Sequence, residues 1–420
     1  MRRVRLETLG CRLNEAELET WAEQFRARGF AISGADDPAD LLVINTCAVT
    51  TEAVRKSRQR LRRLQRHNPH AQLVVTGCAS APEANAALPA VDLLVLNQDK
   101  ERLVDVVCEH FGQPETDAQV TRQLLYPTSR QRAFIKIQDG CRYQCTFCFT
   151  TIARGAERSR PLAAIINQIN HRVDQGVQEI VLSGVQLSGY GVDLGLDLTQ
   201  LIAQILTATD VPRLRLGSVE PWDLGDDFWA LFANPRLAPH LHLPLQSGSD
   251  AVLRRMGRRC KTAEFCALVD QARAQIADFN VTTDLIVGFP GETEAEWQQT
   301  LDIVDTVGFG DIHIFVYSPR PGTAAAQLSD QVAPAIQKQR SHALHQRAAI
   351  HRQAVWQRYL GRTLAVLIEG TTQDSQAHGY TPNYLPVRLI SPPTCTAPIQ
   401  PIRLERIEED VVLGSELFAI

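Results

Sequence analysis

The sequence predicts an α/β protein in three parts: an N-terminal parallel αβ domain, a central partial (β/α)6 barrel and a small C-terminal β-barrel. Buried strand patterns alternate with helical patterns over the first 330 residues, and patterns typical of short strands replace them after residue 360. Strands that alternate with helices form parallel sheets. The length of 420 residues suits two or three domains, which we expect at residues 1–125, 126–350 and 355–420.

The composition indicates a globular protein with no membrane partner. Hydrophobic residues make up 44% of the chain and the formal net charge is −4, so the chain as a whole is not a polycation. No apolar run approaches the roughly 18–20 residues of a membrane span, and charges at Arg2, Arg3 and Arg5 interrupt any secretory signal. Ten cysteines in such a chain favour metal or redox use over disulfides. We therefore expect a cytoplasmic protein.

The first domain carries a cysteine after each of three predicted strands. The strands expected here, which alternate with helices such as Asn14–Gly29, are Val4–Leu9, Leu41–Thr46, Leu73–Gly77 and Val91–Leu96. Ligands of a parallel sheet bind beyond the carboxyl ends of its strands. Cys11, Cys47 and Cys78 each follow such an end, which predicts a three-thiolate site without a fourth protein ligand. The alternative is three unrelated cysteines in the core.

The helix predicted after Cys47 is strongly basic. Its one acid is Glu52, and its basic residues are Arg55, Lys56, Arg58, Arg60, Arg62, Arg63 and Arg66. Such a stripe beside a thiolate site suggests a polyanion as partner. The alternative is an ordinary solvated helix face.

The central domain repeats a strand-then-helix step six times. The predicted strands are Ala133–Gln138, Glu179–Leu182, Arg213–Leu216, His240–Leu243, Val281–Val287 and Ile312–Val316. A complete barrel of this kind has eight such steps, so six predict an open, partial barrel. Glycine and polar residues follow each strand, where barrel enzymes carry out their chemistry, although glycine also simply ends strands.

The first of these strands leads into Cys141, Cys145 and Cys148. Cysteines at this spacing in one loop can converge on one centre. An iron–sulfur cubane normally takes four thiolates, so three leave one iron open to a ligand that is not protein, as binding and cleaving S-adenosylmethionine requires. The alternative is a structural zinc site, but zinc normally takes four protein ligands and no fourth Cys or His follows nearby.

The C-terminal residues change from helical to strand patterns. We expect a long helix at residues 334–359, strands at Thr363–Glu369, Pro386–Ile390 and Val411–Ala419, and an aromatic turn at Gly379–Tyr384. These elements predict a small all-β barrel, an architecture that commonly binds nucleic acid.

With these motifs in place, the whole chain resembles the methylthiotransferase family of radical S-adenosylmethionine enzymes. The Cys-x3-Cys-x2-Cys run, with Phe147 before its third cysteine, is similar to the superfamily signature. The family's three N-terminal cysteine motifs match the residues around Cys11, Cys47 and Cys78, and two further motifs match His242–Ser249 and Thr283–Glu292. Residues 149–152 depart from the family pattern, which more often has Ile-Ile-Pro there.

The resemblance implies two [4Fe-4S] clusters and S-adenosylmethionine as cofactors. Cys141, Cys145 and Cys148 would hold the catalytic cluster, and Cys11, Cys47 and Cys78 an auxiliary cluster that carries the sulfur. Ser218 and Glu220 would bind the ribose of S-adenosylmethionine. The other residues expected at this cofactor are Phe147, Gly184, Gln246 and Asp284. For each of the residues expected at S-adenosylmethionine, the alternative is a purely structural role at the end of a strand.

Members of the family act on three substrates: isopentenyladenosine in tRNA, threonylcarbamoyladenosine in tRNA, and an aspartate of a ribosomal protein. Arg215–Pro221, Leu182–Leu187 and Gly379–Tyr384 resemble the threonylcarbamoyladenosine branch. The resemblance thus implies a radical enzyme that adds a 2-methylthio group to the adenine beside the anticodon. A TRAM-like C-terminal domain and the basic helix would bind the RNA backbone. An electron donor and a sulfur source are also required. A non-enzymatic iron–sulfur RNA-binding module is the alternative from another class.

Overall fold

The structure is a computed structural model that describes residues 2–34, 37–85, 88–114, 131–371 and 376–417. It divides into two compact units. Unit 1 comprises Met1–Thr128, Gln138–Arg158 and Ser318–Gln327, and unit 2 comprises Ser129–Ile137, Ser159–Tyr317 and Leu328–Ile420. The predicted domain boundary at residue 125 lies outside the described residues. Both groups of three cysteines belong to unit 1.

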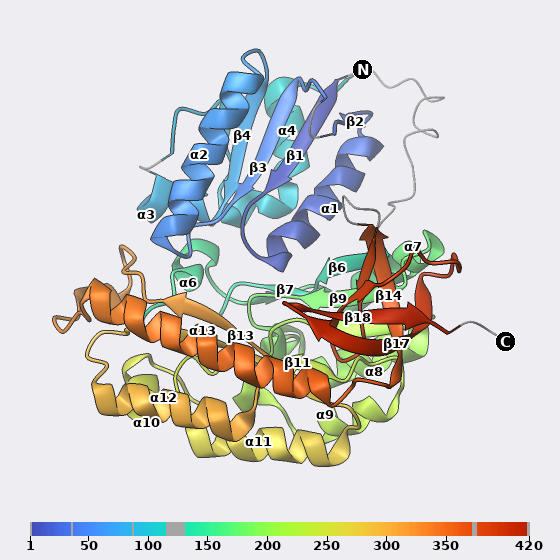
Figure 1. The fold of residues 1–420 in the computed structure, drawn as a ribbon. Helices are drawn as coiled ribbons and strands as arrows, with labels where there is room; N and C mark the ends of the chain where they lie inside the picture. Colours follow the sequence, from blue (N-terminus) through green and yellow to red (C-terminus); the bar gives the residue numbers. More distant parts are fainter. Residues whose placement is uncertain (1, 35–36, 86–87, 115–130, 372–375, 418–420) are drawn as a thin grey trace. The chain divides into compact units, whose positions relative to one another are not determined.

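Unit 1 contains a five-stranded parallel sheet in the order β2-β1-β3-β4-β5 (Figure 1). Its strands are β1 (Arg3–Thr8), β2 (Ala31–Ile32), β3 (Leu41–Thr46), β4 (Gln72–Gly77) and β5 (Leu93–Leu94). Its helices are α1 (Arg12–Ala27), α2 (Thr51–His67), α3 (Pro82–Asn85), α4 (Leu103–Phe111) and α6 (Thr150–Arg154). All four predicted strands are present, although Val91–Leu96 shortens to β5, and the two-residue β2 is an addition.

Helices cover both faces of this sheet, because successive strand residues point to opposite sides. Val43 packs with Trp21 of α1 and Val107 of α4. The next residue, Ile44, packs against Leu61 of α2 on the other face. With both faces buried, the carboxyl ends of the strands are the part of the sheet left to form a site.

Unit 2 contains six parallel strands in chain order. They are β6 (Arg132–Lys136), β9 (Glu179–Ser183), β10 (Arg213–Leu216), β11 (His240–His242), β12 (Asn280–Val287) and β13 (Asp311–Val316). The sheets β10-β9-β6 and β11-β12-β13 are joined by the bridges Leu214↔Leu237 and Ser218↔His242. The intervening helices are α7 (Leu162–Asp174), α8 (Leu198–Ala208), α9 (Asp226–Ala230), α10 (Asp250–Arg255), α11 (Thr262–Gln275) and α12 (Glu294–Val307). This arrangement is the predicted partial (β/α)6 barrel.

The C-terminal part of unit 2 is a helix followed by a closed five-stranded barrel. The elements are α13 (Pro334–Gln357), β14 (Thr363–Thr371), β15 (Ala377–Tyr380), β16 (Pro386–Leu389), β17 (Ile399–Glu408) and β18 (Val411–Glu416). The small β-barrel was predicted, but β15 and β17 were not. β15 includes Gly379 and Tyr380, the first two residues of the predicted aromatic turn. Pro401 lies inside β17, and proline weakens the sequence signal of a strand.

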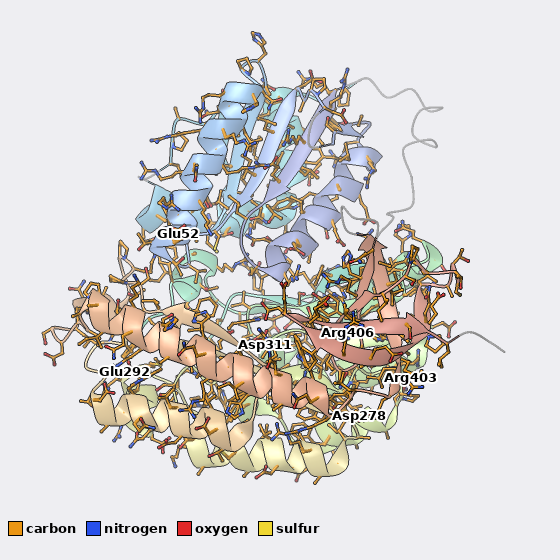
Figure 2. All side chains as sticks on the ribbon, in the orientation of Figure 1. Glu52, Asp278, Glu292, Asp311, Arg403 and Arg406 are labelled. Carbon is orange, nitrogen blue, oxygen red and sulfur yellow. The ribbon has the colours of Figure 1, made fainter. Side chains whose placement is uncertain are left out.

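Ion pairs attach α13 and the start of the barrel to the rest of unit 2 (Figure 2). Arg340 of α13 binds Glu292 at 2.7 Å, and Arg362 binds Asp278 at 2.7 Å. The first pair is buried and the second is half-exposed. Breaking the buried pair is therefore expected to cost more, since a lone charge would remain in the interior.

Candidate functional site

The three N-terminal cysteines are neighbours at the carboxyl edge of the unit 1 sheet. Cys11 lies between β1 and α1, Cys47 follows β3, and Cys78 follows β4. The pKa of Cys47 is raised to about 11, chiefly by burial and further by the nearby Cys78 and Cys11. Such mutual effects arise only between groups a few ångströms apart. The parallel sheet thus brings together three thiols that are far apart in the sequence.

Two glycines allow the strand ends to approach each other closely. A Cβ on Gly10 would lie 2.8 Å from the Cβ of Cys47, and one on Gly77 would lie 2.2 Å from the backbone oxygen of Thr46. Both glycines also have positive φ angles, +118° at Gly10 and +100° at Gly77, which residues with a side chain rarely adopt. Glycine directly before Cys11 and Cys78 is therefore a requirement of the packing.

The second group of cysteines lies on one loop between β7 (Gln138–Asp139) and α6. The backbone N–H of Cys148 donates to the carbonyl of Cys145 at 3.0 Å, and that of Cys141 donates to the carbonyl of Gly155 at 3.1 Å. All three cysteines and the intervening Phe147 are half-buried. The hydrogen bond from Cys141 to Gly155 therefore joins the two ends of the loop, and its half-buried thiols remain accessible to a bound group.

Each group of cysteines supplies three thiols, whereas a structural zinc ion normally takes four protein ligands. A multi-iron cluster with one iron left open to another ligand therefore fits three thiols better than mononuclear zinc does. The thiols differ in exposure: Cys11 is exposed, Cys78 is buried, and the other four are half-buried. Within the described ranges, the one group of three ligand atoms that lie within 4.8 Å of one another is His242, Asp284 and His313.

Arg154 connects the two groups of cysteines inside unit 1. Its guanidinium donates to Glu17 at 3.1 Å, to Asp139 at 2.9 Å and to Asn14 at 2.7 Å. Asn14 follows Cys11 by one helical turn, and Asp139 lies just before Cys141. Arg154 ends α6 and is only 4% exposed. The sequence analysis did not single out Arg154, because an arginine in a polar segment carries no local sign of burial.

The other predicted site residues gather at the strand ends of unit 2. Ser218 bridges to His242, and the backbone N–H of Gln246 donates to the carbonyl of Asp284 at 2.8 Å. Gln246 has a φ of +75°, a conformation that non-glycine residues keep only where the surroundings impose it. Gly184 follows β9 directly. These residues lie at one edge of unit 2, while Phe147 belongs to unit 1.

Glu220 forms an ion pair with an arginine that the sequence analysis did not identify as its partner. Its two carboxylate oxygens accept from the two terminal nitrogens of Arg258, at 3.0 and 2.7 Å. Arg258 also lies over the ring of Trp222, 4.4 Å from its centroid. Burial raises the pKa of Glu220 despite this partner. A ribose hydroxyl that binds Glu220 would therefore donate to a carboxylate that already accepts from Arg258.

Comparisons with family models and with known proteins agree on the family of this chain. Residues 3–95 match the family described as uncharacterized protein family UPF0004, and residues 135–304 match the radical SAM superfamily. The threonylcarbamoyladenosine tRNA methylthiotransferase MtaB of Thermotoga maritima is 36% identical over 92% of this chain and 91% of its own. The MtaB of Bacillus subtilis is 35% identical over 92% and 90%. The chain belongs to the radical S-adenosylmethionine tRNA methylthiotransferase family.

Membership in this family means that the chain is a radical enzyme that uses S-adenosylmethionine and a [4Fe-4S] cluster. Another relative, the tRNA-2-methylthio-N(6)-dimethylallyladenosine synthase of Cereibacter sphaeroides, is 36% identical over 88% of this chain and 87% of its own. The fold is shared with the radical S-adenosylmethionine methyltransferase TsrM of Kitasatospora setae, with a TM-score of 0.54, 15% identity and 77% coverage of each chain. Among the described residues, no helix is long and apolar enough to cross a membrane.

The basic helix of this methylthiotransferase-family chain is α2. Its exposed cations are Arg55, Lys56, Arg62, Arg63 and Arg66. Arg55 binds Glu52 in the first turn at 2.6 Å (Figure 2), and the half-buried Arg60 binds Glu7 at 2.5 Å. The second half of α2 therefore carries most of the positive charge.

The predicted aromatic turn packs inward. Tyr380 and Tyr384 stack with their centroids 4.8 Å apart, and the guanidinium of Arg132 lies 5.0 Å from the first ring. Arg215 lies 4.7 Å from the ring of Tyr384, and Thr381 is fully buried. This turn therefore holds the small barrel against strands β6 and β10 of unit 2.

Proposed function

We propose that the protein adds a 2-methylthio group to N6-threonylcarbamoyladenosine beside the anticodon of tRNA. The observation that carries this proposal is the pair of cysteine groups in one compact unit, joined through the buried Arg154. A reaction that joins radical formation at one site to sulfur delivery from another would need the two cysteine groups at a fixed separation, and a buried charge network supplies such rigidity.

Cys141, Cys145 and Cys148 would hold the catalytic cluster, and Cys11, Cys47 and Cys78 the auxiliary cluster that delivers sulfur. Support comes from the two sets of three thiols, each one ligand short of the four that a structural zinc ion normally takes. When bound, the clusters and S-adenosylmethionine supply radical and sulfur-transfer chemistry, while the protein positions them. Adenine C2 is an unactivated carbon, for which a radical route is chemically suited.

The residues proposed for S-adenosylmethionine in unit 2 are Gly184, Ser218, Glu220, Gln246 and Asp284, and Phe147 is the residue proposed for it in unit 1. Polar groups at the strand ends of a barrel are where such cofactors are bound. The imposed conformation of Gln246 supports the assignment, because strained backbone concentrates at functional sites. Ser218 and Glu220 would bind the ribose hydroxyls, with Arg258 holding the carboxylate in place.

The tRNA would be held electrostatically and read at its anticodon stem-loop. The exposed cations of α2 support this, as do Arg403 and Arg406 on the exposed face of β17 (Figure 2). Phosphate contacts by such residues make binding depend on salt, and an unstacked loop base is accessible to protein. We place this enzyme in the cytoplasm, with functional parts at residues 1–125, 126–350 and 355–420.

A second candidate substrate is isopentenyladenosine in tRNA. The Cereibacter sphaeroides relative named for the dimethylallyladenosine reaction is as similar, at 36% identity, as the Thermotoga maritima MtaB. The threonylcarbamoyl substrate is favoured by the longer matches of the MtaB relatives and by the residues Arg215–Pro221.

The test is mass spectrometry of tRNA nucleosides from cells with and without this gene, complemented by variants. Loss of 2-methylthio-threonylcarbamoyladenosine with accumulation of its parent supports the proposal, and loss of the isopentenyl compound instead moves the enzyme to the second substrate. Replacing Cys141, Cys145 and Cys148 with alanine should abolish the modification, as should replacing Cys11, Cys47 and Cys78. A Cys266→Ala/Cys395→Ala control should retain it. Unchanged tRNA would point to a ribosomal protein, and modification without Cys141, Cys145 and Cys148 would overturn the radical mechanism.

A further inference from the structure

Three side chains of unit 2 form a group that the proposed reaction does not use as a unit. His242 ends β11, Asp284 lies in β12 and His313 lies in β13, which are neighbours in one sheet. The register pairs His242 with Thr282 and Asp284 with His313. Register partners and residues two apart in a strand share one face of a sheet, so the three side chains point the same way.

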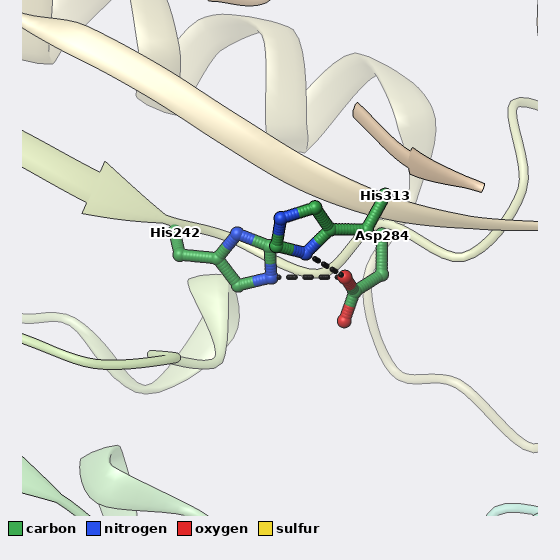
Figure 3. A group of neighbouring side chains, drawn as sticks. All are labelled: His242, Asp284 and His313. Carbon is green, nitrogen blue, oxygen red and sulfur yellow. Dashed lines mark hydrogen bonds and ion pairs between the residues drawn. The ribbon is translucent and has the colours of Figure 1, made fainter. Parts of the chain in front are cut away.

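The donor atoms of this group are spaced like metal ligands. The Nε2 of His242 lies 3.1 Å from Oδ1 of Asp284, and the Nδ1 of His313 lies 3.2 Å from the same oxygen. Figure 3 shows both imidazoles facing this carboxylate. Neighbouring ligands around zinc lie about 3.3 Å apart, given bonds of about 2.0–2.1 Å. Small side-chain movements would therefore admit an ion between them.

A neighbouring hydroxyl is placed to orient His242 as a ligand. The Nδ1 of His242 lies 2.9 Å from Oγ1 of Thr282, which lies 3.1 Å from Nε2 of His240. One proton arrangement has His242 donating to Thr282 and Thr282 donating to His240. That arrangement leaves the lone pair of His242 Nε2 directed at Asp284. Metal-binding histidines typically donate their second ring N–H to such a partner.

The surroundings suit an ion that enters from solvent. The side chains of His242 and Asp284 are 14% and 21% exposed, whereas that of His313 is 59% exposed. Two imidazoles and one carboxylate are a donor set for zinc, iron(II) or manganese, and three protein ligands leave a coordination position open.

We propose that His242, Asp284 and His313 bind a divalent transition-metal ion, with an open position for water or an oxygen of a bound ligand. The site is distinct from both cysteine groups and does not depend on the proposed substrate. Asp284 would bind the ion through Oδ1, which faces both imidazoles, and its Oδ2 would remain for S-adenosylmethionine.

The test uses the full-length protein with its clusters, purified without oxygen, mixed with zinc sulfate and desalted. We expect one zinc per chain by mass spectrometry, with only nitrogen and oxygen ligands in zinc-edge X-ray absorption. His242→Ala and His313→Gln should lose this zinc while keeping their iron. His313 is exposed, so its replacement leaves the fold intact even if His242→Ala does not fold. Thr282→Val should weaken zinc binding by about 10–100-fold.

The matched control is His351→Ala. His351 binds Asp305 at 2.7 Å, which is also a histidine–carboxylate pair, and it should retain the zinc. Absence of retained zinc, sulfur among its ligands, or equal zinc in wild type and His313→Gln would each overturn the proposal. S-adenosylmethionine binding is measured in the same variants. His313→Gln should leave it unchanged, which shows that zinc is lost without damage to the residues proposed for the cofactor.

Discussion

Arg154 of α6 donates to Glu17 of α1 at 3.1 Å, and neither side chain is more than 4% exposed. Glu17 also accepts from Lys100 at 2.6 Å and from Asn45 at 2.8 Å. Asn45 lies two residues before Cys47, and Asn14, another partner of Arg154, lies three residues after Cys11. The network thus contacts the chain next to both groups of cysteines.

We expect Arg154→Gln to destabilise unit 1 by about 3–5 kcal/mol, because it leaves Asp139 without its cation in the interior. The variant should also retain less iron, since the strand ends that carry Cys11 and Cys47 lose a common anchor. Iron content and chemical unfolding of the anaerobically purified protein measure both effects. Arg158→Gln, in the same segment but exposed, should match wild type. Wild-type stability and iron content in Arg154→Gln would contradict this account.

Gly140→Ala is expected to prevent the catalytic loop from closing. The added Cβ would lie 2.0 Å from the backbone oxygen of Ala156, which cannot move without opening the loop next to Cys141. Gly155→Ala is the matched control, because its φ is also positive and nothing lies within 4 Å of its Cβ. Gly155→Ala should cost only about 1–2 kcal/mol. Iron content in a background without Cys11, Cys47 and Cys78 reports on this loop alone, and equal iron in both variants would refute the prediction.

Glu179 makes unit 2 sensitive to acid. Burial raises its pKa, but Arg215 and Arg132 outweigh this effect and lower the pKa to about 2. The unfolded value is about 4.3, so the stabilisation is present above pH of about 4.3 and is lost as the pH falls towards 2.

Glu179→Gln should therefore destabilise unit 2 by about 3–5 kcal/mol at pH 7 and remove part of the acid dependence. Urea unfolding followed by tryptophan fluorescence measures this. The six cysteines proposed as cluster ligands are replaced by alanine in this experiment so that loss of clusters does not contribute. Glu264→Gln, at an exposed residue, is the control. A Glu179→Gln profile parallel to that of the parent below pH 4 would show that the pairs at Glu179 do not govern acid stability.

Replacing Arg62, Arg63 and Arg66 with alanine should weaken tRNA binding and reduce its salt dependence. Each phosphate contact contributes about 0.7–0.9 to the slope of log affinity against log salt, so three contacts contribute about 2. Filter binding between about 50 and 200 mM salt measures the slope. The control removes Lys338 and Arg347 of α13 together with Arg358, the residue directly after this helix. Equal losses in both triple variants would show a general charge effect instead of a binding face on α2.

Much of the fold was predictable because its signals are local. The strand patterns at Leu41–Thr46 and Arg213–Leu216 coincide with β3 and β10. β3 is a largely apolar run, as buried parallel strands are, whereas β10 alternates arginine and leucine. The spacing of Cys141, Cys145 and Cys148 is likewise readable within one loop. By contrast, β17 was missed because Pro401 interrupts its strand pattern, although β17 pairs with β14 in the barrel.

The amino-acid sequence alone predicted the fold class, most of the longer elements and the two groups of cysteines, because periodicity and spacing lie within short segments. The identity of the buried charges and of their partners became visible only in the folded chain. Arg154 and Glu17 are 137 residues apart, and Glu220 and Arg258 are 38 apart. His242, Asp284 and His313 come from three different strands. Partners at such separations are set by strand register and packing, which leave no local pattern in the chain.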